Sequence, residues 1–256
     1  MNFKETALEA AIAGGNILKK QFGNIESIQA KAAHDIVSSA DYASEKEIRR
    51  IIESAYPEHN VVGEETGDNN KVSEYSWIID PLDGTSNFVT GNPYFSVSIA
   101  LAFKNDVILG IVYNPILDEV YFAEKGKGSF LNDKRIFVSD ERDLKNALLG
   151  SAYSPLEEKI KSGLKDVEKL SLKSRKVVIN FSPALDLCNI ARGRIHGLFD
   201  NGTRPEDHAA GSLILTEAGG RVQNYNSDSW DIKKIGIIAS NGKLQSSIIN
   251  VLKSDD

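Results

Sequence analysis

The sequence predicts a mixed α/β protein, in which an α+β half over residues 1–140 is followed by an α/β half over residues 141–256. Helical spacing near the N-terminus gives way to closely spaced strands, which is typical of an α+β layer. Beyond residue 140, apolar strands alternate with helical patterns, which indicates an α/β arrangement. No Pro/Gly/Ser-rich linker separates the two stretches, so we expect them to pack as one unit.

The N-terminal elements follow from helical periodicity and from the residues that interrupt it. Apolar residues at helical spacing predict a first helix over residues 2–22. Residues 24–40 lose this period and are expected to form a loop. Asp41 precedes a second predicted helix over residues 42–55, which Pro57 ends.

Short apolar runs bounded by turn residues predict the strands. In the first half, the predicted strands cover residues 60–63, 75–80, 94–104, 107–113, 119–124 and 129–138. In the second half, strands over residues 147–152, 176–181, 195–200 and 236–240 alternate with helices near 156–170, 183–192, 206–218 and 243–253.

Composition limits the classes of partner. The net charge of −6 and the absence of a dense Lys/Arg run argue against nucleic acid as the main partner. A single cysteine, Cys188, permits neither an intrachain disulfide nor a cysteine zinc cluster. The N-terminus lacks the pattern of a signal peptide, and no window approaches the roughly 20 apolar residues that span a bilayer. We therefore expect a soluble, cytoplasmic protein with no membrane partner.

The motif D-P-L-D-G-T at residues 80–85 directly follows an apolar strand. Asp80 and Asp83 can converge there on one small volume, with the carbonyl of Leu82 between them, and Gly84 lets the backbone approach a ligand. Two carboxylates held close together favour a bound cation, and oxygen ligands favour a hard ion such as Mg²⁺. The alternative interpretation is an ordinary turn with Asp as a cap and Gly as a hinge.

Two further acidic motifs flank this one. Adjacent glutamates, Glu64 and Glu65, follow a short strand; such pairs are most often solvated, but pairing of strands would bring Glu64 and Asp80 to the same sheet edge. Asp207 opens a helix at the position of an N-cap, and capping alone would explain it. The small residues that follow Asp207 would let this helix end approach a shared metal site.

The three motifs occur together as G-E-E at residues 63–65, D-P-L-D-G-T-S-N-F at 80–88, and D-x-A-A-G with T-E-A-G-G between 207 and 220. In this order and spacing the chain resembles the inositol monophosphatase family, and most of all its compact archaeal and bacterial enzymes that accept inositol phosphates, fructose 1,6-bisphosphate or both. The resemblance extends from the first helix to the last. It implies a layered αβαβα sandwich of the sugar-phosphatase type, a homodimer, and hydrolysis of a sugar or inositol phosphate by water activated with two or three Mg²⁺ ions.

The resemblance also implies roles for individual residues. The implied metal ligands are Glu64, Asp80, the Leu82 carbonyl, Asp83 and Asp207. The implied catalytic residues are Asp41 and Thr85, which orient the attacking water, and Glu65, which supports the metal ligands. The implied substrate contacts are Asp83, Gly84, Thr85, Ser182, Asp200 and Asp207. Lys31 and Asp35 resemble the segment of the family that closes over a further metal.

Two departures from the family pattern concern the substrate. Glu206 stands where the family commonly has Trp, and residues 177–185 read V-V-I-N-F-S-P-A-L in place of an R-x-x-G-S-A-A-L-like segment. Both lie near the sugar-facing side of the family's site, so the choice between inositol phosphate and fructose bisphosphate stays open. The candidates for binding a second phosphate are Arg175, Arg192 and Arg204.

Three alternative functions remain. A haloacid-dehalogenase-like phosphatase uses D-x-D-G-T with an aspartyl nucleophile, but this chain has one more residue between its aspartates. A 3′-phosphoadenosine 5′-phosphate phosphatase usually has Lys-Glu-Phe after D-G-T, where this chain has residues 86–88, S-N-F. A non-catalytic metal-binding module would be expected to have lost some of the site residues, all of which are present.

Overall fold

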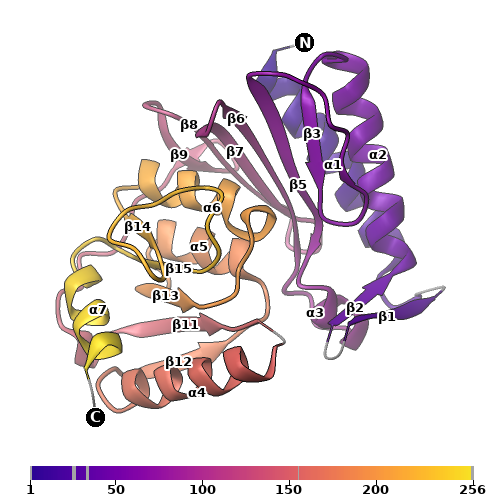
Figure 1. The fold of residues 1–256 in the computed structure, drawn as a ribbon. Helices are drawn as coiled ribbons and strands as arrows, with labels where there is room; N and C mark the ends of the chain where they lie inside the picture. Colours follow the sequence, from indigo (N-terminus) through magenta and orange to yellow (C-terminus); the bar gives the residue numbers. More distant parts are fainter. Residues whose placement is uncertain (1, 25–26, 33–34, 155, 255–256) are drawn as a thin grey trace.

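The computed structural model describes residues 2–24, 27–32, 35–154 and 156–254, and of residues 30–32, 35 and 36 it describes the backbone alone. Helices and sheets alternate in five layers, in the order helix, sheet, helix, sheet, helix (Figure 1). The predicted αβαβα sandwich is confirmed.

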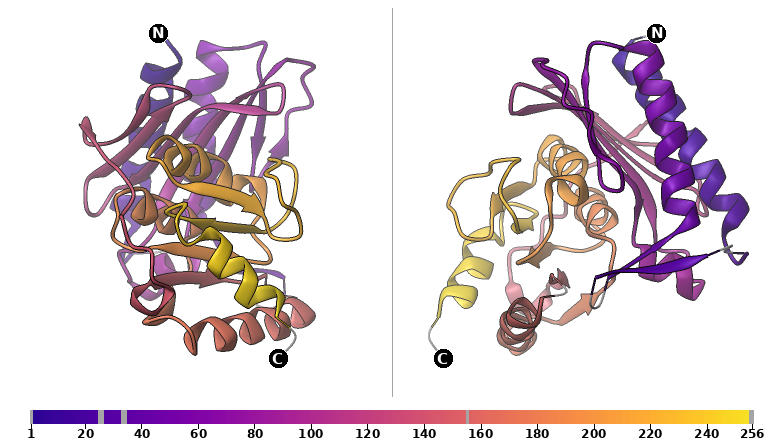
Figure 2. Two further views of the ribbon diagram at one scale, coloured as in Figure 1. Left: turned by 90° about the vertical axis from the view of Figure 1, so that its left-hand side faces the viewer. Right: turned by 45° about the vertical axis from the view of Figure 1, so that its right-hand side comes forward.

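The first layer is a pair of helices, α1 (Phe3–Gln21) and α2 (Ser39–Ala55), which pack side by side on the outer face of the larger sheet (Figure 2). A capping box starts α1, because the Asn2 side chain accepts from the Glu5 N–H at 2.9 Å and the Glu5 carboxylate accepts from the Asn2 N–H at 3.1 Å. Both predicted N-terminal helices are therefore present.

The larger sheet carries the first two acidic motifs. Its strands lie in the order β10-β9-β8-β7-β6-β5-β3-β4. Their bounds are β3 Asn60–Gly63, β4 Gly67–Asp68, β5 Tyr75–Asp83, β6 Ser96–Phe103, β7 Asp106–Asn114, β8 Glu119–Glu124, β9 Gly128–Leu131 and β10 Lys134–Arg135. A short helix, α3 (Thr85–Thr90), follows β5 at once. Neighbours pair antiparallel except β3 and β5, which are parallel, so these two strands end at the same edge of the sheet.

The middle layer consists of α5 (Pro183–Ala191) and α6 (Pro205–Glu217), which lie between the two sheets. Close approach of α6 to β7 depends on Gly110, because a Cβ at this position would lie 2.7 Å from the Ala210 carbonyl oxygen. One buried apolar cluster contains Ile78 and Val112 of the larger sheet together with Ile214 of α6. The core of the molecule thus draws on both halves of the chain.

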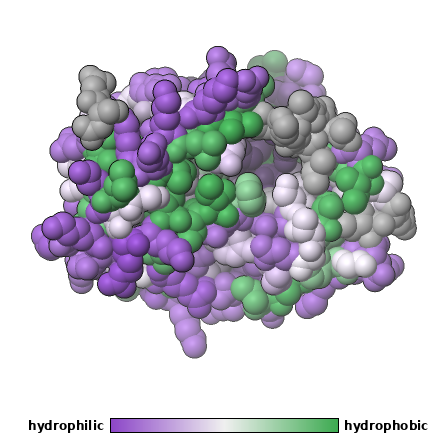
Figure 3. All heavy atoms as spheres, turned by 90° about the horizontal axis from the view of Figure 1, so that it is seen from below, coloured by the Kyte–Doolittle hydropathy of each residue, from purple (hydrophilic) through white to green (hydrophobic). Residues whose placement is uncertain are grey.

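The second sheet and its outer helices complete the layers. Its strands lie in the order β12-β11-β13-β15-β14, with bounds β11 Leu148–Ala152, β12 Lys176–Ile179, β13 Gly197–Asp200, β14 Arg221–Asn224 and β15 Ile237–Ser240. The outer helices are α4 (Glu157–Ser171) and α7 (Gln245–Lys253). Seen from the side on which α4 lies, the surface mixes hydrophilic and apolar residues (Figure 3). Among the described residues, no helix combines the length and the apolar character needed to cross a membrane.

Two predictions about local structure are wrong. Residues 24–40 do not form only a loop, because β1 (Ile28–Ala32) and β2 (Asp35–Ser38) pair antiparallel. The pairing depends on backbone hydrogen bonds, so the sequence shows no clear alternation of apolar and polar side chains there. The strand expected over residues 129–138 is divided into β9 and β10 by a turn in which Asn132 and Asp133 adopt positive φ angles of 46° and 61°.

Candidate active site

Strand geometry brings the first three carboxylates together. Because β3 and β5 are parallel neighbours, Glu64 and Asp80 follow the same sheet edge, and the Glu64 N–H continues the pairing to the Ile79 carbonyl at 3.1 Å. Asp80 pairs with Ser98 and Asp83 pairs with Ser96, so β5 has one more residue than β6 between these two pairs, which makes a β-bulge. This bulge turns Asp83 to the face that Asp80 occupies, and both side chains line one cavity.

The fourth carboxylate comes from the second half of the chain. Asp207 lies at the third position of α6, not at the N-cap that the sequence indicated, because Pro205 begins the helix. Its Oδ2 accepts from the Arg204 N–H at 2.7 Å, which caps the helix from within. The Arg204 side chain reaches in turn to Glu64, with 2.8 Å between Nη2 and Oε1. The start of α6 therefore contacts the end of β3.

Asp41 and Thr85 form a hydrogen-bonded pair at the N-terminal end of α2. Asp41 is fully buried; its Oδ2 accepts from the Ser38 N–H at 2.9 Å and hydroxyl at 2.6 Å, which caps α2. Its Oδ1 accepts from the Thr85 hydroxyl at 3.0 Å. The same hydroxyl lies 3.2 Å from the Leu82 carbonyl. Burial raises the pKa of Asp41, although the hydrogen bonds from Ser38 and Thr85 oppose this change.

Burial and nearby negative charges raise the pKa values of Asp80, Asp83 and Asp207. Burial, then the charges of Glu64, Asp83 and Asp207, raise the pKa of Asp80 well above its ordinary value. Burial raises the pKa of Asp83 to about 7, although hydrogen bonds from Ser182 and Ser96 oppose it. Burial, then Glu64, raise the pKa of Asp207. A bound cation or a cationic side chain would therefore stabilise the ionised forms of these carboxylates.

Serines hold Asp83 from two sides of the site. The Ser96 hydroxyl donates to Asp83 Oδ2 at 3.1 Å, and the Ser182 hydroxyl donates to the same oxygen. Ser182 was expected to contact substrate, but it is fully buried and its neighbours Phe181 and Pro183 line the cavity instead. We therefore propose that Ser182 positions Asp83.

The carboxylates border a cavity of about 580 Å³ between the two halves of the chain. Its lining residues are Glu64, Asp80, Leu82, Asp83, Gly84, Thr85, Ser86, Ala152, Tyr153, Ser154, Ile160, Phe181, Pro183, Asp200, Gly202, Thr203, Arg204 and Asp207. Asp200 ends β13 with Oδ1 accepting from the Gly202 and Thr203 N–H groups at 2.7 and 2.9 Å. Gly84 has a φ of 96°, and a Cβ there would lie 3.2 Å from the Phe181 carbonyl, so the turn after Asp83 requires glycine.

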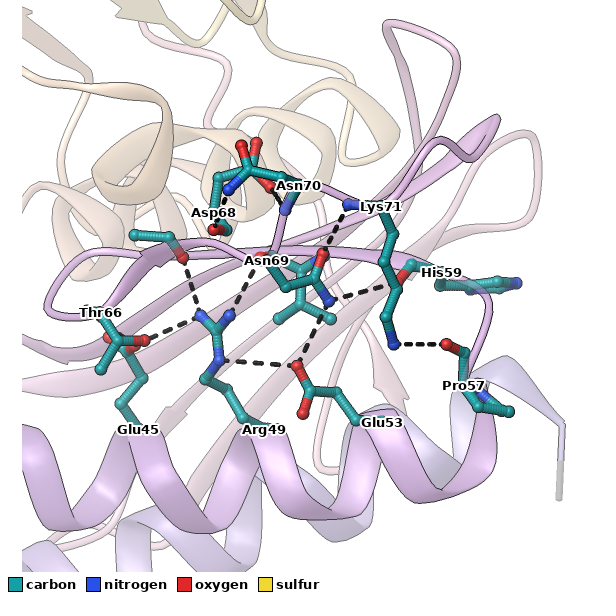
Figure 4. Close-up of polar contacts among 12 residues, drawn as sticks. Glu45, Arg49, Glu53, Pro57, His59, Thr66, Asp68, Asn69, Asn70 and Lys71 are labelled. Carbon is teal, nitrogen blue, oxygen red and sulfur yellow. Dashed lines mark hydrogen bonds and ion pairs between the residues drawn. The ribbon is translucent and has the colours of Figure 1, made fainter.

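An ion pair between the buried Glu45 and the partly exposed Arg49 lies next to the turn after β3 (Figure 4). Glu45 of α2 is fully buried and accepts from the N–H groups of Glu65 at 2.8 Å and of Thr66 at 3.0 Å, and from the Thr66 hydroxyl. Arg49, one helical turn later, lies 3.5 Å from Glu45 and donates to the Gly67 carbonyl at 2.9 Å. This network joins α2, which holds Asp41, to the turn after β3.

Sequence reasoning missed both Glu45 and Arg49. The available signal was their spacing, because Asp41, Glu45 and Arg49 recur every four residues and so share one face of α2. Glu45 is buried beneath the turn after β3, where it accepts from the backbone of that turn.

The remaining predicted residues have different positions. Glu65 does not line the cavity formed by the described residues, whereas Gly84 and Thr85 do. Of the three arginines, Arg204 lines the cavity, Arg192 pairs with Glu119 at 2.7 Å, and Arg175 is exposed away from the lining. The side chains of Lys31 and Asp35 lie outside what the structure describes.

The donor set fits a hard divalent cation by its chemistry. Within the part of the chain that the structure describes, no three Asp, Glu, His or Cys side chains already form a metal-ligand group. The guanidinium of Arg204 is the positive charge beside Glu64, and Asp80 Oδ1 accepts from the Leu82 N–H at 2.9 Å. Even so, clustered carboxylates beside the Leu82 carbonyl oxygen are the ligand type that Mg²⁺ prefers.

Comparison with known proteins identifies the family. The pattern of the inositol monophosphatase family matches residues 2–255. The chain belongs to the inositol monophosphatase family. Among curated relatives, the fructose-1,6-bisphosphatase/inositol-1-monophosphatase of Aquifex aeolicus is 38% identical over 98% of this chain and 95% of its own length. The Nus factor SuhB of Haemophilus influenzae is 37% identical over 96% of this chain and 94% of its own length.

Solved structures agree with this family. An IMPase of Thermotoga maritima superposes with a TM-score of 0.91 at 30% identity, covering 98% of this chain and 97% of the other. Family membership supports a phosphatase, and the names of the relatives differ in the activity that they state.

Proposed function

We propose that the protein is a Mg²⁺-dependent phosphomonoesterase that releases phosphate from inositol 1-phosphate, fructose 1,6-bisphosphate or both. The observation that carries this proposal is the convergence of carboxylates from both halves of the chain on one cavity beside the Asp41–Thr85 pair. The residues that would hold Mg²⁺ are Glu64, Asp80, Asp83, Asp207 and the Leu82 carbonyl. When bound, the ions would neutralise charge on the phosphate and make water more acidic.

The Asp41–Thr85 pair supplies a proton acceptor for the attacking water. The Thr85 hydroxyl has one proton and donates it to Asp41, which leaves its oxygen free to accept a hydrogen bond from water. Water held in this way presents a lone pair to phosphorus. The water oxygen forms the new P–O bond while water gives a proton to the Thr85 oxygen and Thr85 gives its own hydroxyl proton to Asp41. The ester P–O bond breaks, and the departing alkoxide takes up a proton from solvent water.

Other residues position the phosphate and the alcohol. We propose that the N–H groups of Gly84 and Thr85, which line the cavity, bind phosphate oxygens, and that Asp200 accepts from hydroxyl groups of the alcohol. Asp200 suits this role because backbone N–H groups hold its Oδ1 and thereby fix the carboxylate. Glu65 would support the turn that carries Glu64.

The test is phosphate release from inositol 1-phosphate, fructose 1,6-bisphosphate and 3′-phosphoadenosine 5′-phosphate, each with and without Mg²⁺. We expect Mg²⁺-dependent release from one or both of the first two, and a loss of at least roughly 10³-fold in Asp83→Asn. Preference for the adenosine substrate would replace the substrate assignment. A trapped phosphoaspartate would replace the mechanism.

A second candidate is a non-catalytic metal-binding protein. It is favoured by the 37% identical relative that is named as a Nus factor rather than as a phosphatase. If the chain binds Mg²⁺ but releases phosphate from none of the three substrates, this candidate replaces the enzyme. We also propose a homodimer from the family resemblance, which sedimentation equilibrium would test.

A further inference from the structure

Phe181 is an exposed aromatic residue in an unfavourable backbone conformation at the edge of the cavity. Its φ is 54°, in the left-handed region that bulky residues avoid, and 53% of its surface is exposed. Either property alone disfavours phenylalanine at this position. Strain of this kind persists where the surroundings impose it, and it clusters at sites that bind ligands.

The residues on both sides of Phe181 are fixed to the candidate active site. Asn180 accepts from the Asn87 side chain at 2.6 Å and donates to Asp186 at 2.8 Å. Ser182 donates to Asp83. The backbone of Phe181 is thus held from both directions, and its carbonyl lies against Gly84. Phe181 lines the cavity, so a ligand bound there would lie beside this residue.

The cavity has apolar as well as acidic lining residues. Phe181, Pro183, Tyr153 and Ile160 contribute apolar surface, whereas the carboxylates and Asp200 contribute charge. A ligand that satisfies both kinds of lining has hydroxyl groups at its edge and an apolar C–H face. Aromatic side chains with a few placed polar groups are the usual lining of sites that orient small ligands.

We propose that Phe181 is a specificity-determining residue, whose ring packs against the C–H face of a cyclic polyol phosphate. This inference rests on the proposed phosphatase function and deepens it, because it selects ring substrates over acyclic ones. An acyclic polyol phosphate such as glycerol 2-phosphate offers the same phosphate but no ring face. The contact is made away from the reacting bond, so it acts on binding in the ground state and transition state alike.

The test compares inositol 1-phosphate with glycerol 2-phosphate in wild type, Phe181→Gly and Phe181→Leu. For Phe181→Gly we expect kcat/KM for inositol 1-phosphate to fall about three- to tenfold, mainly through KM, and that for glycerol 2-phosphate to change by less than about twofold. Phe181→Leu, which keeps apolar bulk, should lie between. Glycine adopts the observed φ without strain, so Phe181→Gly should have an equal or higher Tm, which separates lost packing from misfolding.

Phe137→Leu is the matched control, because Phe137 is 61% exposed and outside the cavity lining. It should leave both substrates unchanged. Equal losses for both substrates in Phe181→Gly, or no loss for either, would overturn the inference while leaving the phosphatase intact.

If wild type hydrolyses neither substrate, the proposed function fails and calorimetric binding of the two phosphates still tests the packing. Tighter wild-type binding of inositol 1-phosphate that Phe181→Gly removes would then support the inference, and equal binding would refute it.

Discussion

Replacing Glu45 by glutamine tests whether this buried carboxylate, which lies beneath the Glu64–Glu65 turn, supports the site. Glu45 accepts from two backbone N–H groups at 2.8 and 3.0 Å, and from the Thr66 hydroxyl. Glutamine keeps one acceptor oxygen, and its amide nitrogen would face a backbone N–H donor. Hydrogen bonds to a charged group contribute about 1.5–3 kcal/mol each, and a buried donor without an acceptor costs about 1–3 kcal/mol.

The expected net loss of unfolding free energy is about 2–4 kcal/mol. It stays below the cost of a fully broken buried ion pair, because Arg49 keeps the carbonyls of Gly67 and Val61 at 2.9 and 3.2 Å. For a chain of this size that loss lowers Tm by about 5–15 °C. Because the turn carries Glu64, the Mg²⁺ concentration needed for half-maximal activity should also rise.

The assay is thermal unfolding followed by circular dichroism, with a Mg²⁺ titration of phosphate release. Glu47→Gln is the matched control, because Glu47 lies on the same helix and its pair with Arg50 is on the surface. Equal Tm values for Glu45→Gln and Glu47→Gln would refute the reasoning. A lower Tm with an unchanged Mg²⁺ requirement would restrict Glu45 to a structural role.

Three further predictions concern packing, pH and metal. A Cβ at Gly63 would lie 2.3 Å from Glu45 Oε1, so Gly63→Ala should destabilise, and by less when combined with Glu45→Ala, which a double-mutant cycle by denaturant unfolding measures. Burial raises the pKa of Asp186 from 3.8 to about 6, so the folded state binds this proton more tightly than the unfolded state and the free energy of unfolding falls as pH rises from 3.8 to 6. Asp186→Asn should remove about 2–3 kcal/mol of that fall, which a series of Tm measurements against pH would show. Mg²⁺ at one hundred times its Kd should stabilise the wild-type protein by about 2.7 kcal/mol and so raise its Tm, but it should not raise the Tm of Asp83→Asn. An equal rise in both proteins would place the ion elsewhere.

The layers and the acidic cluster were accessible from sequence because both depend on local patterns. Apolar periodicity identified α1 and α2 and most strands, and three separated motifs identified the family. The spacing of Asp80 and Asp83 indicated convergence, and the structure shows that a bulge in β5 achieves it. The bulge is a feature of the backbone pairing between β5 and β6, so the sequence indicates it only through the residues of the D-P-L-D-G turn.

What the sequence did not reveal depends on contacts between distant segments. Glu45 lies in a charged stripe that looks solvated until the turn after β3 is placed over it. The hydrogen bond from Ser182 to Asp83, which lies 99 residues earlier, is another contact that no local pattern contains. The strain at Phe181 follows from bonds made by its neighbours to Asn87 and Asp83, which no local pattern contains.

The site carboxylates are positioned by hydrogen bonds that the fold needs for other reasons. Asp41 caps α2 through the Ser38 N–H, Asp207 caps α6 through the Arg204 N–H, and Asp80 binds the Leu82 N–H. Among the described residues, Asp80 and Asp207 each use one oxygen in this way and keep the second. These bonds favour the ionised forms and offset part of the burial and repulsion that raise the pKa values. The acids are therefore held near one another by backbone donors, so a cation would meet ligands that are already oriented and whose mutual repulsion it relieves.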